Sequence, residues 1–142
     1  MMDKDELLKL LRKEEGNKLE FKERFNDSVL ESISALANTY GGLIIVGVNK
    51  KREIVGLNDD KNYQRIANRI VDKLDITPDL DRVDVDNKSI LAIEVNKSYI
   101  PVSFEGRYYK RVGNTTRRVN FEELKRFFQR DLRWERLSCG YC

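Results

Sequence analysis

The sequence has no histidine, and its 142 residues include only two cysteines and two prolines. Without histidine the chain cannot build a Ser-His-Asp or Cys-His catalytic arrangement, and it lacks the commonest protein ligand for zinc. Both cysteines, Cys139 and Cys142, lie at the C-terminal end, whereas a secreted disulfide scaffold spreads its cysteines through the fold. Any catalysis would therefore depend on carboxylates, lysines, tyrosines or a metal held by oxygen ligands.

Long hydrophobic runs are also missing. The longest apolar run, Leu43 to Val48, is interrupted by Gly47, and a membrane span needs about 18 apolar residues. The first six residues carry no apolar region typical of a signal peptide. We therefore expect a cytoplasmic protein with no membrane partner, of a length that suits one domain.

Charge is unevenly distributed along the chain. The net charge is +3 overall, but residues 1–96 carry a net −3 and residues 97–142 carry a net +6. A basic segment of this kind attracts polyanions, so we expect such a partner to bind the C-terminal part.

Apolar periodicity predicts a chain of alternating helices and strands. A short helix is expected over residues 3–13 and a half-buried strand from Leu19. A capping box at residues 28–31 opens a helix that ends at Gly41-Gly42, followed by a buried central strand from Leu43 to Val48. Later we expect a hairpin partner over residues 53–57, a helix capped by Asp59 or Asp60, a hairpin over residues 83–95, and a strand over residues 107–112. In a last helix, capped by Asn120, four side chains would face the core: Phe121, Leu124, Phe127 and Phe128. The fold class predicted is α/β (α+β), a mixed β-sheet of hairpins covered by about three to four helices.

Five cations and no acid lie between Arg107 and Arg118, with two interleaved tyrosines. On a strand, Arg107, Tyr109 and Arg111 would share one face, and residues 113–116 would form the following loop. Cations neutralise phosphates and tyrosine rings stack on unpaired bases, so the segment predicts nucleic-acid binding. A solvated edge strand whose cations discourage aggregation is the alternative. The predicted nucleic-acid-binding residues are Lys22, Arg107, Tyr109, Lys110, Arg111, Arg117 and Arg118, with Tyr108 as a second stacking candidate.

Three further patterns suggest chemistry less directly. Glu15 and Glu20 flank a helix–strand break and could converge on a divalent metal, although such spacing is more typical of solvated charges. Between Gly42 and Gly47 the residues read as a strand, and the Lys-Ser/Thr of a phosphate loop is missing, which argues against nucleotide hydrolysis. The C-terminal cysteine pair has no second pair to complete a zinc site, so an irregular tail is expected.

Taken in order, several strings resemble the Schlafen-type AlbA domain over residues 14 to about 128. They are Leu19–Lys22, Ile33–Gly42, Ile45–Val48, Ile54–Leu57, Ile93–Val95, Ile100–Val102 and Tyr108–Thr116. The resemblance implies a module that binds DNA or RNA, found in prokaryotes at the N-terminal part of a longer transcriptional regulator, often with a winged-helix domain downstream. It divides the chain into an N-terminal helix (1–13), an AlbA-like domain (14–130) and a tail (131–142) that would lead into a linker.

The same resemblance implies a second activity, because the vertebrate Schlafen branch carries a three-acid endoribonuclease site in this domain. Two of the acids match Glu15 and Glu20, and Asn49 stands at the third position. Under this alternative Glu15 and Glu20 are catalytic and, with Asn49, would hold Mg²⁺ or Mn²⁺; no other cofactor is expected. The leading hypothesis is a non-catalytic nucleic-acid-binding module. A third hypothesis is an oligomerisation domain, a homodimer for example, without a nucleic-acid role.

Overall fold

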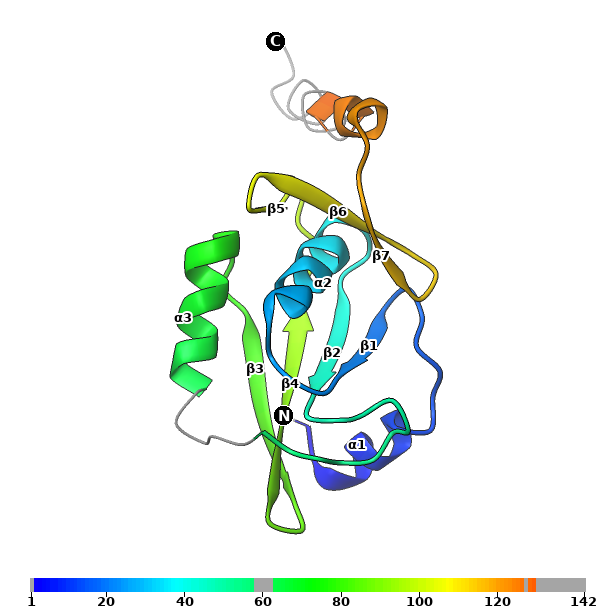
Figure 1. Ribbon diagram of the computed structural model, residues 1–142, viewed down its shortest axis with the longest axis vertical. Helices are drawn as coiled ribbons and strands as arrows, with labels where there is room; N and C mark the ends of the chain where they lie inside the picture. Colours follow the sequence, from blue (N-terminus) through cyan, green and yellow to red (C-terminus); the bar gives the residue numbers. More distant parts are fainter. Residues whose placement is uncertain (1, 58–62, 127, 130–142) are drawn as a thin grey trace, which may run out of the picture.

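Two β-sheets enclose a central helix in the computed structural model, which describes residues 2–57, 63–126 and 128–129 (Figure 1). The named helices are α1 (Lys4–Leu10), α2 (Asp27–Asn38) and α3 (Tyr63–Leu74). The strands are β1 (Leu19–Lys22), β2 (Gly42–Val46), β3 (Asp79–Val85), β4 (Lys88–Val95), β5 (Ser103–Phe104), β6 (Arg107–Val112) and β7 (Thr115–Arg118). Residues 121–126 are also helical. The expected α+β class is confirmed.

The first sheet has the strand order β1-β2-β4-β3. β1 runs parallel to β2, whereas β4 is antiparallel to both of its neighbours. β2 therefore has a partner on each side, as its continuous apolar sequence predicts. Because side chains alternate along a strand, Ile44 and Val46 face α2 while Ile45 faces the opposite side.

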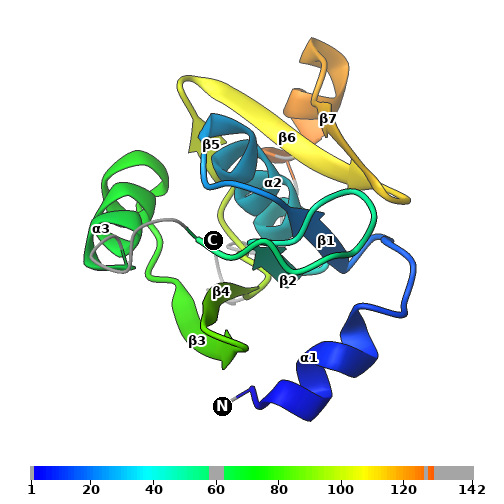
Figure 2. The ribbon, with the colours of Figure 1, turned by 60° about the horizontal axis from the view of Figure 1, so that its bottom comes forward.

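Helices cover both faces of this sheet. On one face α1 contributes Leu7 to a cluster with Phe21, Ile45 and Ile90, and Figure 2 shows α1 on the side of the sheet away from α2. On the other face α2 and α3 pack together over β2 and β4. In the described residues, no helix is both long and apolar enough to cross a membrane.

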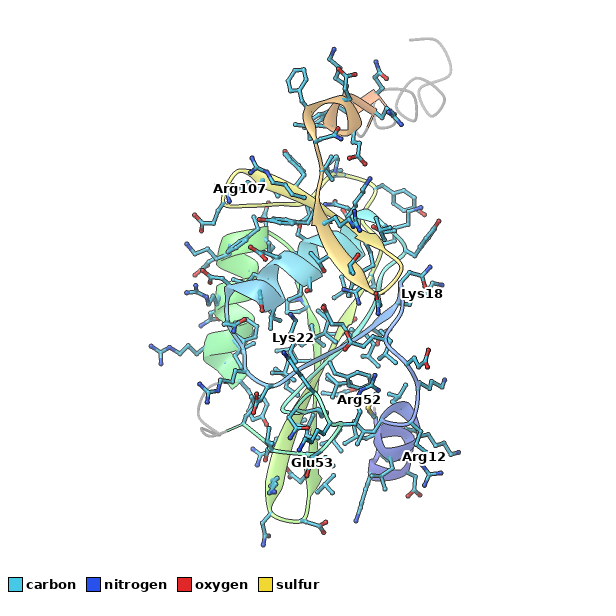
Figure 3. All side chains as sticks on the ribbon, turned by 45° about the vertical axis from the view of Figure 1, so that its right-hand side comes forward. Arg12, Lys18, Lys22, Arg52, Glu53 and Arg107 are labelled. Carbon is cyan, nitrogen blue, oxygen red and sulfur yellow. The ribbon has the colours of Figure 1, made fainter. Side chains whose placement is uncertain are left out.

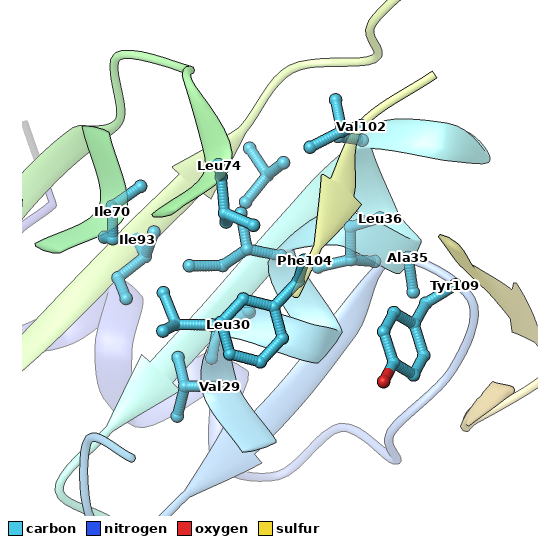
Figure 4. Close-up of a cluster of buried hydrophobic side chains, with 14 of the residues drawn as sticks. Val29, Leu30, Ala35, Leu36, Ile70, Leu74, Ile93, Val102, Phe104 and Tyr109 are labelled. Carbon is cyan, nitrogen blue, oxygen red and sulfur yellow. The ribbon is translucent and has the colours of Figure 1, made fainter. Parts of the chain in front are cut away.

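α2 is buried on nearly every side because the second sheet, β5-β6-β7, packs against its other face. Figure 4 shows Phe104 of β5 and Tyr109 of β6 meeting Leu30 and Ala35 of α2. Small residues such as Ala35 and Ala37 along α2 let both sheets approach it closely. The principal hydrophobic core therefore lies around α2, between the two sheets.

Several local predictions need correction. The N-cap of α2 is Asn26, not Ser28, because the Asn26 side chain accepts the Ser28 backbone N–H at 3.1 Å. The expected hairpin partner over residues 53–57 is reduced to one bridge between Val48 and Ile54, and residues 115–116 lie in β7 rather than in a loop. Phe121 and Phe128 are 72% and 44% exposed and do not face the core. Asp59, Asp60, Phe127 and the tail from residue 131 lie outside the described residues.

Candidate nucleic-acid interface

The C-terminal end of α2 holds the second sheet in place through two polar side chains. The Asn38 amide donates to the carbonyl oxygens of Val102 and Tyr109, each at 2.9 Å, and its oxygen accepts the Val102 N–H at 2.7 Å. The Thr39 hydroxyl donates to Ala35 O at 2.8 Å and accepts the Arg111 N–H at 2.9 Å. These bonds satisfy buried backbone groups that would otherwise lose hydrogen bonds on folding. They therefore fix where β6 crosses the helix.

The two glycines that follow allow a turn too tight for any other residue. Gly41 has a φ of 72°, and a Cβ there would lie 2.7 Å from Val95 O. Gly42 has a φ of 153°, and its Cβ would lie 2.6 Å from Lys18 O. The chain can thus turn from α2 directly into β2 beside the end of β4 and the start of β1.

Arg111, one of the predicted phosphate ligands, is buried with its side chain 0% exposed. Its guanidinium lies 3.1 Å from a Glu20 carboxylate oxygen and donates to the Thr116 hydroxyl at 3.0 Å. It also donates to the carbonyl oxygens of Gly16, at 3.0 Å, and Leu19, at 3.3 Å. Arg111 therefore joins β1 to the β6–β7 hairpin, and the structure does not bring it to the surface with the other cations.

The two tyrosines of β6 are also engaged within the protein. Tyr109 is buried and its hydroxyl donates to Glu31 at 3.3 Å. Burial is the main cause that raises the pKa of Tyr109, and the Glu31 charge adds to it, while Arg107 opposes the rise. Tyr108 is half-buried and packs edge-to-face on Phe128, with ring centroids 5.7 Å apart. Each ring already has a protein partner.

The remaining predicted cations divide into exposed and paired groups. Arg107, Arg117 and Arg118 are exposed on the second sheet. Lys110 is half-buried, lies opposite Arg117 in the hairpin register and forms an ion pair with Glu123. The structure thus brings these four cations together on one hairpin.

Lys22 lies apart from the hairpin cations, on β1. Its ammonium donates to the Ser28 hydroxyl at 3.3 Å and lies 3.7 Å from a Glu20 oxygen. Figure 3 shows Lys22 near the middle of the molecule and Arg107 well above it, on the second sheet. Lys22 therefore supports the first turn of α2 and is only partly open to solvent.

The three predicted metal ligands do not form one site. One Glu20 oxygen is paired with Arg111, and the other is buried without a hydrogen bond to any described residue. Asn49 uses its amide oxygen to accept the N–H groups of Lys51 and Glu53, each at 2.9 Å, which closes the turn after β2. Glu20 lies opposite Ile44 in the parallel pairing of β1 and β2. Asn49 comes five residues after Ile44, which corresponds to roughly 16 Å of extended chain.

Glu15 lies in the segment before β1, and the described residues hold no group of three acid or cysteine side chains suited to a metal ion. The donor set present around Glu20 therefore does not fit Mg²⁺ or Mn²⁺, which prefer several oxygen ligands, because the nearest charges to its carboxylate are the cations of Arg111 and Lys22. We derive no hydrolytic step from these residues.

Sequence reasoning overlooked two exposed tyrosines, Tyr40 and Tyr99. Tyr40 directly precedes Gly41-Gly42, and Tyr99 lies in the connection between β4 and β5. Both tyrosines lie in tight connections, where the core needs no large side chain, and this position could have predicted that they are exposed. The basic composition around β6 drew attention to Tyr108 and Tyr109 instead.

Comparisons with known proteins agree with this architecture. The chain is similar to a crystal structure of the DIP2311 protein from Corynebacterium diphtheriae, with a TM-score of 0.64 and 26% identity over 80% of this chain and 27% of that chain. It is also similar to a solution NMR structure of the N-terminal domain of a RecG-related protein from Nitrosomonas europaea, with a TM-score of 0.58 and 26% identity over 81% of this chain and 92% of that chain.

This chain spans only about a quarter of the DIP2311 chain, so the likeness concerns only part of that protein. A comparison with curated proteins gives no match. The sequence matches the family described as Schlafen, AlbA_2 over residues 15–120, which is most of the chain. The protein therefore belongs to the Schlafen AlbA_2 family.

Proposed function

We propose that this domain acts in the cytoplasm by binding nucleic acid through the exposed cations of the β6–β7 hairpin. Arg107, Arg117 and Arg118 are the main phosphate contacts, and Lys110 joins them. The observation that carries the proposal is the composition of the hairpin: residues 106–121 contain no acid, and three of their cations are exposed. The family and the RecG-related relative support a nucleic-acid-related role.

The hairpin suits this role because its cations reach both sides of an edge strand. Arg117 lies opposite Lys110, and Arg118 lies opposite Tyr109, so consecutive arginines project to opposite faces of β7. Such an edge can follow a phosphate backbone without reading base sequence. Asn38 and Thr39 anchor the hairpin to α2, and Arg111 anchors it to β1. Little of its backbone therefore has to become ordered when a ligand binds.

Lys110 is expected to contribute less than the exposed arginines. Its ammonium is already paired with Glu123, so a phosphate has to replace an existing carboxylate. Within the described residues, Arg117 and Arg118 form no ion pair, and both side chains are exposed to water. We therefore assign most of the electrostatic affinity to the two arginines of β7.

The test is the salt dependence of binding to labelled duplex DNA and single-stranded RNA, measured by fluorescence anisotropy. Replacing Arg117→Gln or Arg118→Gln should weaken binding to all sequences alike and flatten the slope of log K against log salt by about one unit each. Arg69→Gln is the matched control, because Arg69 is an exposed arginine on α3 that pairs with Asp27 at 2.7 Å. Absence of binding by the unmodified protein at low salt would reject the proposal.

We further propose that the binding serves transcriptional regulation within a longer chain. A regulator must distinguish its sites from bulk DNA, so the parent protein should enrich particular duplexes from a random pool. Equal recovery of all duplexes would leave the phosphate contacts intact but contradict the regulatory role.

A further inference from the structure

An exposed apolar patch surrounds the C-terminal end of α2. Its members, which we call the α2-end patch, are Tyr40, Tyr99, Ile100 and Val112, with exposed fractions of 59%, 70%, 75% and 44%. They make up four of the nine large hydrophobic side chains that are exposed in the described parts of the chain. Single exposed apolar residues need no explanation, but a group in one place indicates a binding surface.

Two hydrogen bonds hold the three segments of this patch together. Ser98 N–H donates to Ala37 O at 2.8 Å, which places the segment of Tyr99 and Ile100 against the last turn of α2. Arg111 N–H donates to the Thr39 hydroxyl at 2.9 Å, which places Val112 next to the turn that carries Tyr40. Because these anchors are buried or half-buried, the patch is part of the rigid fold.

The surroundings of the patch carry positive charge. Segments 38–42, 96–103 and 111–116 contain no acid. Lys97 is exposed within the second of them, and Lys18 is exposed beside Gly42, whose Cβ would lie 2.6 Å from Lys18 O. Figure 3 shows Lys18 close to the β6–β7 hairpin. A partner for this surface must therefore combine apolar, flat groups with negative charge.

We propose that Tyr40 and Tyr99 form a base-stacking site for single-stranded nucleic acid, with Lys18 and Lys97 in contact with its phosphates. Unpaired bases offer the flat faces that tyrosine rings can cover, whereas the bases of a duplex are already stacked on each other. The inference rests on the proposed function and adds the strandedness of the ligand and the place where its bases lie. Arg117 and Arg118 lie on the same hairpin as Val112, so one strand can contact both surfaces.

The test compares ring-retaining with ring-removing variants on the full chain. The probe is a labelled oligothymidylate of about 12 nucleotides, within the usual site size of single-strand binders. Tyr40→Leu and Tyr99→Leu should each lower its affinity by about five- to a hundredfold, and Tyr40→Phe and Tyr99→Phe should stay within about twofold of the unmodified protein. The salt slope should not change in any of the four variants, because stacking releases no counterions.

A second measurement does not depend on how the variants fold. The unmodified protein should bind an abasic strand of equal length and charge more weakly than the oligothymidylate, by a factor similar to that of the two leucine replacements combined. Equal affinity for the abasic and thymidine strands would overturn the stacking site.

The outcomes separate this inference from the proposed function. Salt-dependent binding that is unaffected by the leucine variants rejects the stacking site and leaves the hairpin contacts in place. No binding by the unmodified protein rejects both. A leucine variant that changes the oligomeric state in light scattering, with unchanged affinity for the oligothymidylate, shows that the α2-end patch is a protein interface and also overturns the inference.

Discussion

The two sheets of this domain use their side chains differently. The four-stranded sheet is covered on both faces, by α1 on one side and by α2 and α3 on the other, and its central strands are mostly apolar. The three-stranded sheet packs on α2 with one face only, through Phe104, Tyr109 and Arg111, while Arg107, Arg117 and Arg118 face water. The first sheet therefore contributes mainly to the stability of the fold, whereas the second has exposed side chains that a ligand can contact.

The same contrast recurs between two arginines of one hairpin. Arg111 and Arg117 lie on neighbouring strands, yet the first is enclosed by Glu20, Thr116 and two carbonyl oxygens, and the second is exposed. Composition alone does not distinguish the two arginines, whereas in the fold Arg111 is buried and structural and Arg117 lies at the surface. Replacing each of them should therefore change a different measured quantity.

The largest expected effect comes from the buried ion pair. Arg111→Met removes the nearer and buried cation of the Glu20 carboxylate and leaves only the partly exposed Lys22 ammonium 3.7 Å away. The free energy of unfolding should therefore fall by about 3–5 kcal/mol, measured by urea denaturation. The double variant Glu20→Leu with Arg111→Met removes both charges and should recover much of that loss. A single variant as stable as the unmodified protein would show that the pair does not hold the hairpin.

A smaller loss of stability is expected at the end of α2. Asn38→Ala removes the partners of Val102 and Tyr109 backbone groups and should lower the free energy of unfolding by about 2–4 kcal/mol. Hydrogen exchange should show β5 and β6 losing more protection than β2. Equal loss in both sheets would contradict the view that Asn38 anchors the second sheet specifically.

The exposed arginines should show the opposite behaviour. The double variant Arg117→Gln with Arg118→Gln should leave the free energy of unfolding within about 0.5 kcal/mol of the original, since neither side chain is buried. Its affinity for nucleic acid at low salt should fall by about tenfold or more. A large loss of stability with unchanged affinity would reverse the assignment of these residues.

The smallest effect concerns alkaline pH. Burial and Glu31 raise the pKa of Tyr109, so the neutral phenol is favoured in the folded protein. The stability that this group contributes is present below its ordinary pKa near 10 and is lost as pH rises through the higher folded pKa. In urea denaturation above pH 10, Tyr109→Phe should therefore lose less stability with rising pH than the unmodified protein does, and parallel curves would contradict this.

Sequence periodicity located the elements that matter most, because local signals determine them. α2 ends at Asn38, shortly before Gly41, and the buried strand β2 begins at Gly42; both follow from residues adjacent in the chain. Alternation also placed Tyr109 and Arg111 on one face of β6. It could not tell that this face is the inner one, because the partner that makes a buried arginine acceptable, Glu20, is far away in the sequence.

The candidate surface was predictable in composition but not in its members. The acid-free stretch around β6 and β7 identified the basic hairpin, yet four of the seven predicted binding residues are buried or half-buried: Lys22, Tyr109, Lys110 and Arg111. Tyr40 and Tyr99 come from connections that approach each other only in the folded chain. A pattern within one segment cannot reveal a surface assembled from three.

The most direct test of the account measures salt-dependent nucleic-acid binding and unfolding on two variants together, Arg111→Met and the Arg117→Gln, Arg118→Gln pair. We predict that the pair flattens the slope of log K against log salt by about two units and leaves stability unchanged. Arg111→Met, studied at a temperature where it remains folded, should keep the original slope while unfolding at lower urea. A reduced slope for Arg111→Met, or an unchanged slope for the pair, would contradict the division between a buried structural arginine and two exposed binding arginines.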